Sequence, residues 1–210
     1  MTNYGKNLLL ATIAGIVFLL GAFVSSPVSE ASSFAPLGDS TFLQRNQQVN
    51  LNAEGERVSF IVQPDGSMRL FSRDGQHDYL SFCNYYEGQG GDGWSVRKIE
   101  IKNPNRVLFE INATAGAHAR NVGYWIIGKY KGKWVTFVSL DTLSQYGYAV
   151  GGWHRISTDL DYAGNFVLTS QHEYMPPGAM YSYQARTATD FMAKLFWDNN
   201  AQWFGIQRIR

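Results

Sequence analysis

The sequence predicts an all-β fold, an antiparallel sandwich or barrel of about ten strands built from consecutive hairpins. Short segments in which apolar and polar residues alternate recur along the chain, about 8–12 residues apart. Turn residues, mainly glycine with aspartate, asparagine or proline, separate these segments. No long segment has the period of an amphipathic helix.

The first expected element is a three-stranded meander. Residues 57–62, 67–71 and 77–83 alternate, and short turns join them at Pro64-Asp65-Gly66 and at Arg73-Asp74-Gly75-Gln76. In the first turn, proline presets one backbone angle and glycine accepts a positive φ. Residues 49–51 also alternate.

The middle of the chain predicts two further hairpins. The expected strands are 95–101, 106–112, 123–130 and 134–139, with turns at 102–105 and 131–133. In this pattern Glu110 alternates with apolar neighbours and is expected to point to solvent. Residues 140–146 suit a helical segment of one or two turns, which Ser139 would cap.

The last part of the chain is less regular. Residues 147–165 are rich in glycine and aspartate and are expected to be irregular, and residues 166–172, 181–187 and 202–209 are expected to be strands. Residues 188–197 fit either a capped helix or the first strand of a terminal hairpin that turns at 198–201. We favour the hairpin.

The amino-terminal segment predicts export. Lys6 is followed by the uncharged and mostly apolar residues 8–24, and small residues precede Ser32. This pattern is typical of a signal peptide at 1–31 that is cut before Ser32, and an uncleaved membrane anchor is the alternative. Residues 32–46 would then be a polar leader and 47–210 a single β domain. We expect the protein to be secreted or part of the cell envelope, with membrane contact only if the segment is not cleaved.

Composition excludes several functional classes. Lys plus Arg is 18 and Asp plus Glu is 17, so the formal net charge of +1 argues against a nucleic-acid partner. A single cysteine, Cys83, excludes a disulfide scaffold and is expected to be a buried structural thiol. No motif indicates a cofactor.

Two glycine-rich segments carry the candidate ligand-binding residues. Residues 84–94 hold three aromatic side chains and two carboxylates among four glycines, and 146–154 has the same character with an imidazole added. Sugars are bound in this way, with an aromatic ring against the sugar ring and polar groups on its hydroxyls. The alternatives are a long hairpin loop and a glycine-kinked core strand. The residues singled out are Tyr85, Tyr86, Glu87, Trp94, Trp153 and His154.

Metal sites are weakly indicated. Asp159 and Asp161, with Gly164, resemble the start of a calcium loop, but Ala163 replaces an oxygen ligand and Ser170 stands where a bidentate glutamate belongs. The four histidines are too far apart in the sequence to form a local metal-binding pair.

These observations favour a secreted β domain that binds a ligand, with a glycan or cell-envelope polymer first, and they leave the question of catalysis open. A secreted glycoside-type hydrolase is the first alternative, because a carboxylate pair assembled from distant strands leaves no motif. Its candidate members are Glu87, Asp92, Asp161 and Glu173. The second alternative is a non-catalytic structural or assembly protein of the envelope, which would expose an apolar patch or a strand edge.

Overall fold

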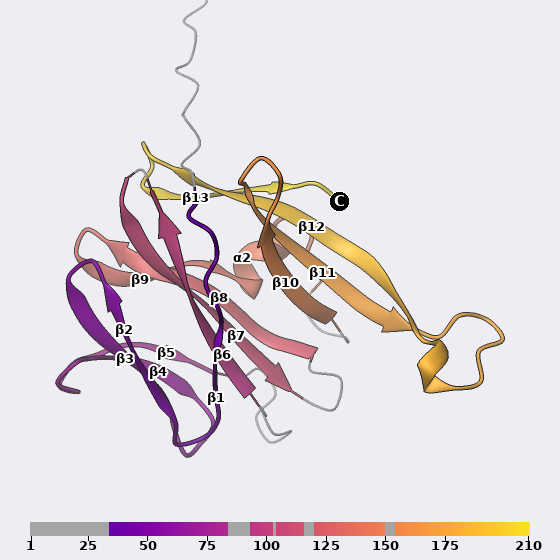
Figure 1. The fold of residues 1–210 in the computed structure, drawn as a ribbon, viewed down its shortest axis with the longest axis horizontal. Helices are drawn as coiled ribbons and strands as arrows, with labels where there is room; N and C mark the ends of the chain where they lie inside the picture. The colour runs from indigo at the N-terminus through magenta and orange to yellow at the C-terminus, as the bar shows by residue number, and fades with distance from the viewer. Residues whose placement is uncertain (1–33, 84–92, 103, 116–119, 150–153) are drawn as a thin grey trace, which may run out of the picture. The chain divides into compact units, whose positions relative to one another are not determined.

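The protein is an open, all-antiparallel β structure. The computed structural model describes residues 34–83, 93–102, 104–115, 120–149 and 154–210 (Figure 1). Within these residues thirteen strands form three sheets, and none of the sheets closes into a barrel. The predicted all-β antiparallel class is therefore confirmed, and the barrel is ruled out for this part of the chain.

The largest sheet has five strands in the order β1-β6-β7-β8-β9. Its middle strand, β7, pairs with β6 over residues 106–114 and with β8 over residues 109–115. The predicted hairpins at 95–112 and 123–139 are confirmed, and their strands are longer than the sequence pattern predicts. The bounds are β1 Thr41–Leu43, β6 Gly93–Ile101, β7 Arg106–Ala115, β8 Arg120–Tyr130 and β9 Lys133–Ser139.

The predicted meander is confirmed in the sheet β2-β3-β4-β5. Its tight turns have the expected chemistry: Asp65 accepts the backbone N–H of Ser67 at 2.8 Å, and Gly66 has a φ of 88°. The hairpin β2–β3 turns at Glu54 and Gly55, which both have positive φ. The bounds are β2 Gln48–Ala53, β3 Glu56–Val62, β4 Met68–Ser72 and β5 Asp78–Phe82.

The third sheet has the order β10-β11-β12-β13. The terminal hairpin is confirmed in place of the helix, because residues 188–197 belong to β12 and residues 193–198 of that strand pair with β13. Two expectations are wrong here: residues 154–160 form a regular strand, and residues 182–184 form a 3-10 turn ahead of β12. The bounds are β10 His154–Leu160, β11 Phe166–Tyr174, β12 Arg186–Asp198 and β13 Trp203–Arg208.

Both faces of the five-stranded sheet are buried. One face packs against the sheet β2–β5, and the other packs against β11, β12, β13 and the short helix α2 (Leu140–Ser144). Strand β7 contributes side chains to both cores. Leu108 belongs to the core that contains α2, and Phe109 and Ile111 belong to the core under β2–β5. Ser139 caps α2 as predicted, through a bond from the Thr142 N–H at 3.2 Å.

Alternation between the two faces explains three corrections to the sequence analysis. Glu110 shares the face of Leu108 and is 1% exposed, so the expectation that it points to solvent is wrong. Cys83 is exposed, because it follows the inward-facing Phe82 at the end of β5. The supposed polar leader contributes β1 and the buried Phe34, which bridges to Ile101.

The predicted signal peptide, residues 1–31, lies outside the described residues. No helix that the structure describes is long and apolar enough to cross a membrane.

Gly128 provides a test of the tight packing around β8. A Cβ atom added there would lie 2.3 Å from Leu108 Cδ2 and 3.0 Å from Phe137 Cε2, inside the core. We expect Gly128→Ala to lower the free energy of unfolding by about 1–3 kcal/mol through overpacking. Gly38→Ala is the control, since a Cβ at Gly38 meets nothing within 4 Å. Urea unfolding of both variants measures the difference, and equal stabilities would contradict the packing described here.

Candidate functional site

The first predicted binding loop contributes one described candidate residue. Three of its four candidate residues lie outside the described part of the chain: Tyr85, Tyr86 and Glu87. Trp94 is 2% exposed, stacks on Trp125 with ring centroids 5.8 Å apart, and donates its indole N–H to the Gly66 carbonyl at 3.0 Å. Its ring is part of the core under β2–β5 and presents no surface to a ligand.

The second predicted segment brings an imidazole into a polar cluster. Trp153 lies outside the described residues, and His154 begins β10 directly opposite His172 on β11. Asp190 reaches both rings: its carboxylate oxygen Oδ2 is 2.7 Å from His172 Nδ1 and 3.3 Å from His154 Nδ1. Asp190 is the extra residue of a β-bulge in β12, which turns its side chain toward the histidines. The sequence analysis missed this cluster because its members come from three strands.

The weak calcium candidate is a hydrogen-bonded turn. Asp161 Oδ1 accepts the backbone N–H groups of Ala163 and Asn165, at 2.9 and 2.8 Å. A hydrogen bond from the Asn165 side chain, together with these backbone bonds, lowers the pKa of the Asp161 carboxyl. Asp159 accepts from the Leu160 N–H. Nowhere in the described residues are three or more His, Cys, Asp or Glu side chains arranged to hold a metal ion.

One carboxylate pair proposed for the hydrolase does not converge. Asp161 follows β10 at the closed end of the β10–β11 hairpin, and Glu173 lies at its open end. Counted along the strands, about 25 Å separates them, whereas a glycosidase needs a separation of about 5–10 Å. Glu87 and Asp92, the other two candidates, lie outside the described residues.

A polar cleft of about 350 Å³ opens between the five-stranded sheet and β10. We call it the inter-sheet cleft. Its floor is the part of the five-stranded sheet, the central sheet of the fold, that lies beyond the apolar core. Residues 155–158 of β10 form the facing wall. The side chains on the central-sheet side are Phe42, Ser95, Arg97, Glu110, Asn112, Thr114 and Asn121.

A buried ion pair lies at the floor of this cleft. Arg97 and Glu110 are opposite residues on β6 and β7, and Arg97 Nε donates to Glu110 Oε2 at 2.8 Å. The other carboxylate oxygen accepts the hydroxyls of Tyr124 at 3.0 Å and Thr158 at 2.5 Å. Burial raises the pKa of Tyr124 well above its usual value, and the neighbouring Glu110 charge adds to the shift. Both oxygens of Glu110 are thus satisfied within the protein.

The same wall of the cleft ties the outer strand β10 to the central sheet. Asn121 accepts the backbone N–H of Ile156 at 2.7 Å and donates to Asn112 Oδ1 at 2.8 Å. Arg97 also donates to the side chain and the carbonyl of Thr158. The backbone N–H and C=O groups of residues two apart on a strand point to the same edge. The contacts at residues 156 and 158 therefore occupy the edge of β10 that does not pair with β11.

The rim of the cleft carries an exposed aromatic ring. Phe42 lies opposite Ser95 and is 79% exposed, although its neighbour Leu43 is in the core. A solvated phenyl ring beside amides and hydroxyls is the pairing that the sequence analysis sought in the glycine-rich loops. Sequence reasoning missed it, since β1 was assigned to a leader. Phe42 and Leu43 are adjacent apolar residues, so no alternation of apolar and polar residues marked this segment as a strand.

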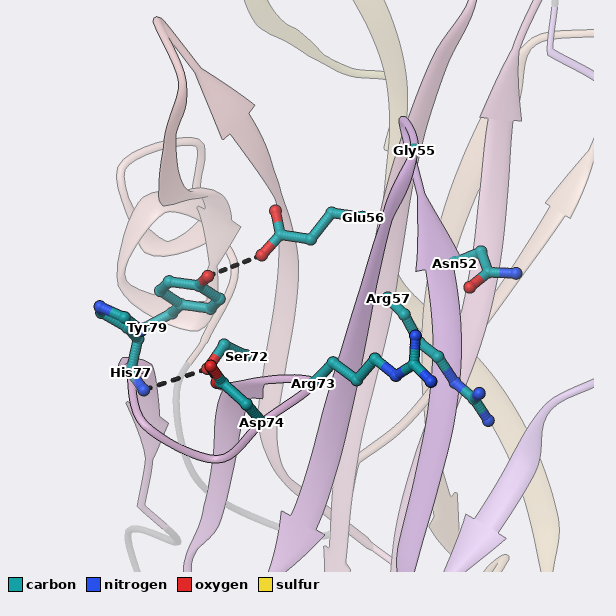
Figure 2. Close-up of a pocket in the computed structure, with 9 residues that line it drawn as sticks. All are labelled: Asn52, Gly55, Glu56, Arg57, Ser72, Arg73, Asp74, His77 and Tyr79. Carbon is teal, nitrogen blue, oxygen red and sulfur yellow. Dashed lines mark hydrogen bonds between the residues drawn. The ribbon is translucent and has the colours of Figure 1, made fainter.

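A second hollow, of about 960 Å³, lies at the turn end of the sheet β2–β5 (Figure 2). Tyr79 donates its hydroxyl to Glu56 at 2.6 Å, which raises the pKa of Tyr79 to about 12. Burial opposes ionisation of Glu56, but hydrogen bonds from Lys129 and Tyr79 outweigh it, and the Glu56 pKa is lowered. Asp74 is held by the Ser72 hydroxyl and the Gln76 N–H.

Comparison of the chain with protein-family models, with curated proteins and with solved structures found no match.

The buried ion pair generates a stability prediction. Glu110→Ala leaves Arg97 without its partner in a site where its side chain is 14% exposed, so we expect unfolding free energy to fall by about 3 kcal/mol or more. The double variant R97M/E110L removes both charges and should recover most of that loss. Glu173→Gln, which breaks the more exposed pair with Arg155 at 2.8 Å, should cost less than about 1 kcal/mol. Chemical denaturation compares the three, and a double variant as unstable as Glu110→Ala would contradict the interpretation.

Proposed function

We propose that this protein is a non-catalytic binding domain that holds a glycan or another hydroxyl-rich cell-envelope polymer in the inter-sheet cleft. The observation that carries the proposal is the exposed Phe42 ring at the rim of a polar, amide-lined cleft. The ring offers a flat apolar surface to one face of a sugar. The amide of Asn112 and the hydroxyl of Ser95 supply donors and acceptors to the sugar hydroxyls.

The chemistry of the carboxylate favours binding over hydrolysis. Glu110 is the one carboxylate among the described residues that line the cleft. Its oxygens accept hydrogen bonds from Arg97, Tyr124 and Thr158, so neither is poised to protonate a glycosidic oxygen or to attack a sugar carbon. The rival hydrolase requires a second carboxyl group that this part of the cleft does not supply.

Export fits this proposal. The positive start and apolar stretch of residues 6–24 are typical of a signal segment, which would place the cleft outside the cytoplasm, where envelope polymers are found.

Retention on insoluble polymers tests the proposal. We expect the purified protein to be retained on at least one of peptidoglycan, chitin and cellulose, and Phe42→Ala to weaken that retention about tenfold, for a loss of about 1.5 kcal/mol of apolar contact. Asn112→Ala should weaken it as well. Tyr183→Ala removes an equally exposed ring outside the cleft and is the control. No retention on any polymer, or equal retention of Phe42→Ala and wild type, would remove the proposal.

A second candidate, an envelope assembly protein, is favoured by a different feature. Residues 174–185, which run from the last residue of β11 to the start of β12 and which we call the arm, contain no charged residue. After Tyr174 they lie beyond the ends of these strands (Figure 1). Of the ten large apolar or aromatic side chains exposed in the described residues, five belong to the arm: Tyr174, Met175, Met180, Tyr181 and Tyr183. Such clustering is typical of a protein contact surface.

Self-association tests this second candidate, because most oligomers pair identical chains. If the arm is an assembly surface, the wild-type protein should sediment as an oligomer at micromolar concentration, and Met180→Asp with Tyr183→Ser should shift it to the monomer. Phe42→Ala is the matched control, since its ring is similarly exposed outside the arm. A monomeric wild type would rule out self-assembly through the arm. It would not affect the glycan proposal.

A further inference from the structure

Two arginines lie side by side on the solvent face of the sheet β2–β5. Asn52 pairs with Arg57 across β2 and β3, and Val58 pairs with Ser72 across β3 and β4. Arg57 precedes Val58 and Arg73 follows Ser72, so the two arginines lie next to each other just past the last pair of this ladder. Val58 is fully buried, so its neighbour Arg57 points outward, and Arg73 is exposed as well.

The view in Figure 2 agrees with this placement. The side chains of Arg57 and Arg73 run to the side of the β3 ribbon on which Asn52 lies, whereas Glu56 and Tyr79 lie on the other side. All five residues line the same hollow.

Neither guanidinium has an acidic partner among the described residues. The nearest carboxylates in sequence are committed elsewhere. Glu56 pairs with Lys129 and Tyr79, and Asp74 holds its own turn through Ser72 and Gln76. Neighbouring like charges repel, so this arrangement is unfavourable unless an anion lies between them.

We propose that Arg57, Arg73 and Asn52 form a second binding site, which takes one anionic group, either a carboxylate or a phosphate. Guanidinium groups present paired N–H donors that match the two oxygens of such a group. The Asn52 amide adds a further donor. The site lies on the outer face of a different sheet from the inter-sheet cleft, so it does not depend on the glycan proposal. A chain with both sites suits a polymer that carries acidic groups.

The test uses polymers that differ in charge chemistry. In affinity electrophoresis at 20 mM NaCl, we expect the full-length protein to bind polygalacturonate, polyphosphate or both. Binding should weaken at higher salt. Neutral dextran should not bind at this site. The variant R57Q/R73Q should bind the anionic polymer at least tenfold more weakly. Retention of polygalacturonate alone assigns a carboxylate ligand, and retention of polyphosphate alone assigns a phosphate.

The matched control removes the same charge elsewhere. Lys131→Gln with Lys133→Gln neutralises two exposed cations at the β8–β9 turn and should leave binding within about twofold, given that the effect of net charge alone is screened. An equal loss in both double variants, or binding to neither anionic polymer, would overturn the proposal.

A second readout separates loss of binding from loss of fold. R57Q/R73Q relieves the repulsion, so its thermal midpoint without anions should equal or exceed that of the wild type. Added inorganic phosphate should raise the wild-type midpoint and leave that of the variant unchanged. A variant that unfolds at lower temperature in both conditions would contradict the assignment.

Discussion

The five-stranded sheet is covered on both faces, so every position of its middle strand has to suit a buried environment. Leu108, Phe109 and Ile111 meet this demand with apolar side chains. Glu110 meets it through hydrogen bonds to three other elements: Arg97 on β6, Tyr124 on β8 and Thr158 on β10. A buried carboxylate that lacked these partners would be strongly destabilising. The same bonds set the distance between β10 and the central sheet, and hence the shape of the inter-sheet cleft.

Local patterns were enough to predict the hairpins. Turns such as Pro64-Asp65-Gly66 have a chemistry that acts within a few residues, and the strands that they connect pair with their neighbours in sequence. The predicted hairpin of β6 and β7 also sets Arg97 opposite Glu110. What the pattern did not reveal is that a third sheet covers this hairpin. Alternation then no longer separates a buried face from a solvated one, which is why Glu110 was misplaced.

The candidate sites depend on contacts between distant segments, and sequence spacing does not report these. The inter-sheet cleft joins residues near 42, 97, 112 and 158. His154, His172 and Asp190 meet through strand register and a bulge. Of the residues chosen for their aromatic or glycine-rich surroundings, Trp94 proved to be a core side chain. Aromatic rings fill β cores as readily as they bind sugars, so residue type alone did not separate the two roles.

The contacts that Asn121 and Arg97 make with β10 also affect how copies of the protein meet. An outer strand with free N–H and C=O groups is a template on which another chain can add a strand, and this is a common route to aggregation. At residues 156 and 158 those groups face side chains of the central sheet. The border of the third sheet at β10 is thus closed at these positions by polar side chains from its own chain, which keeps a strand of another copy from adding there and growing into a fibril.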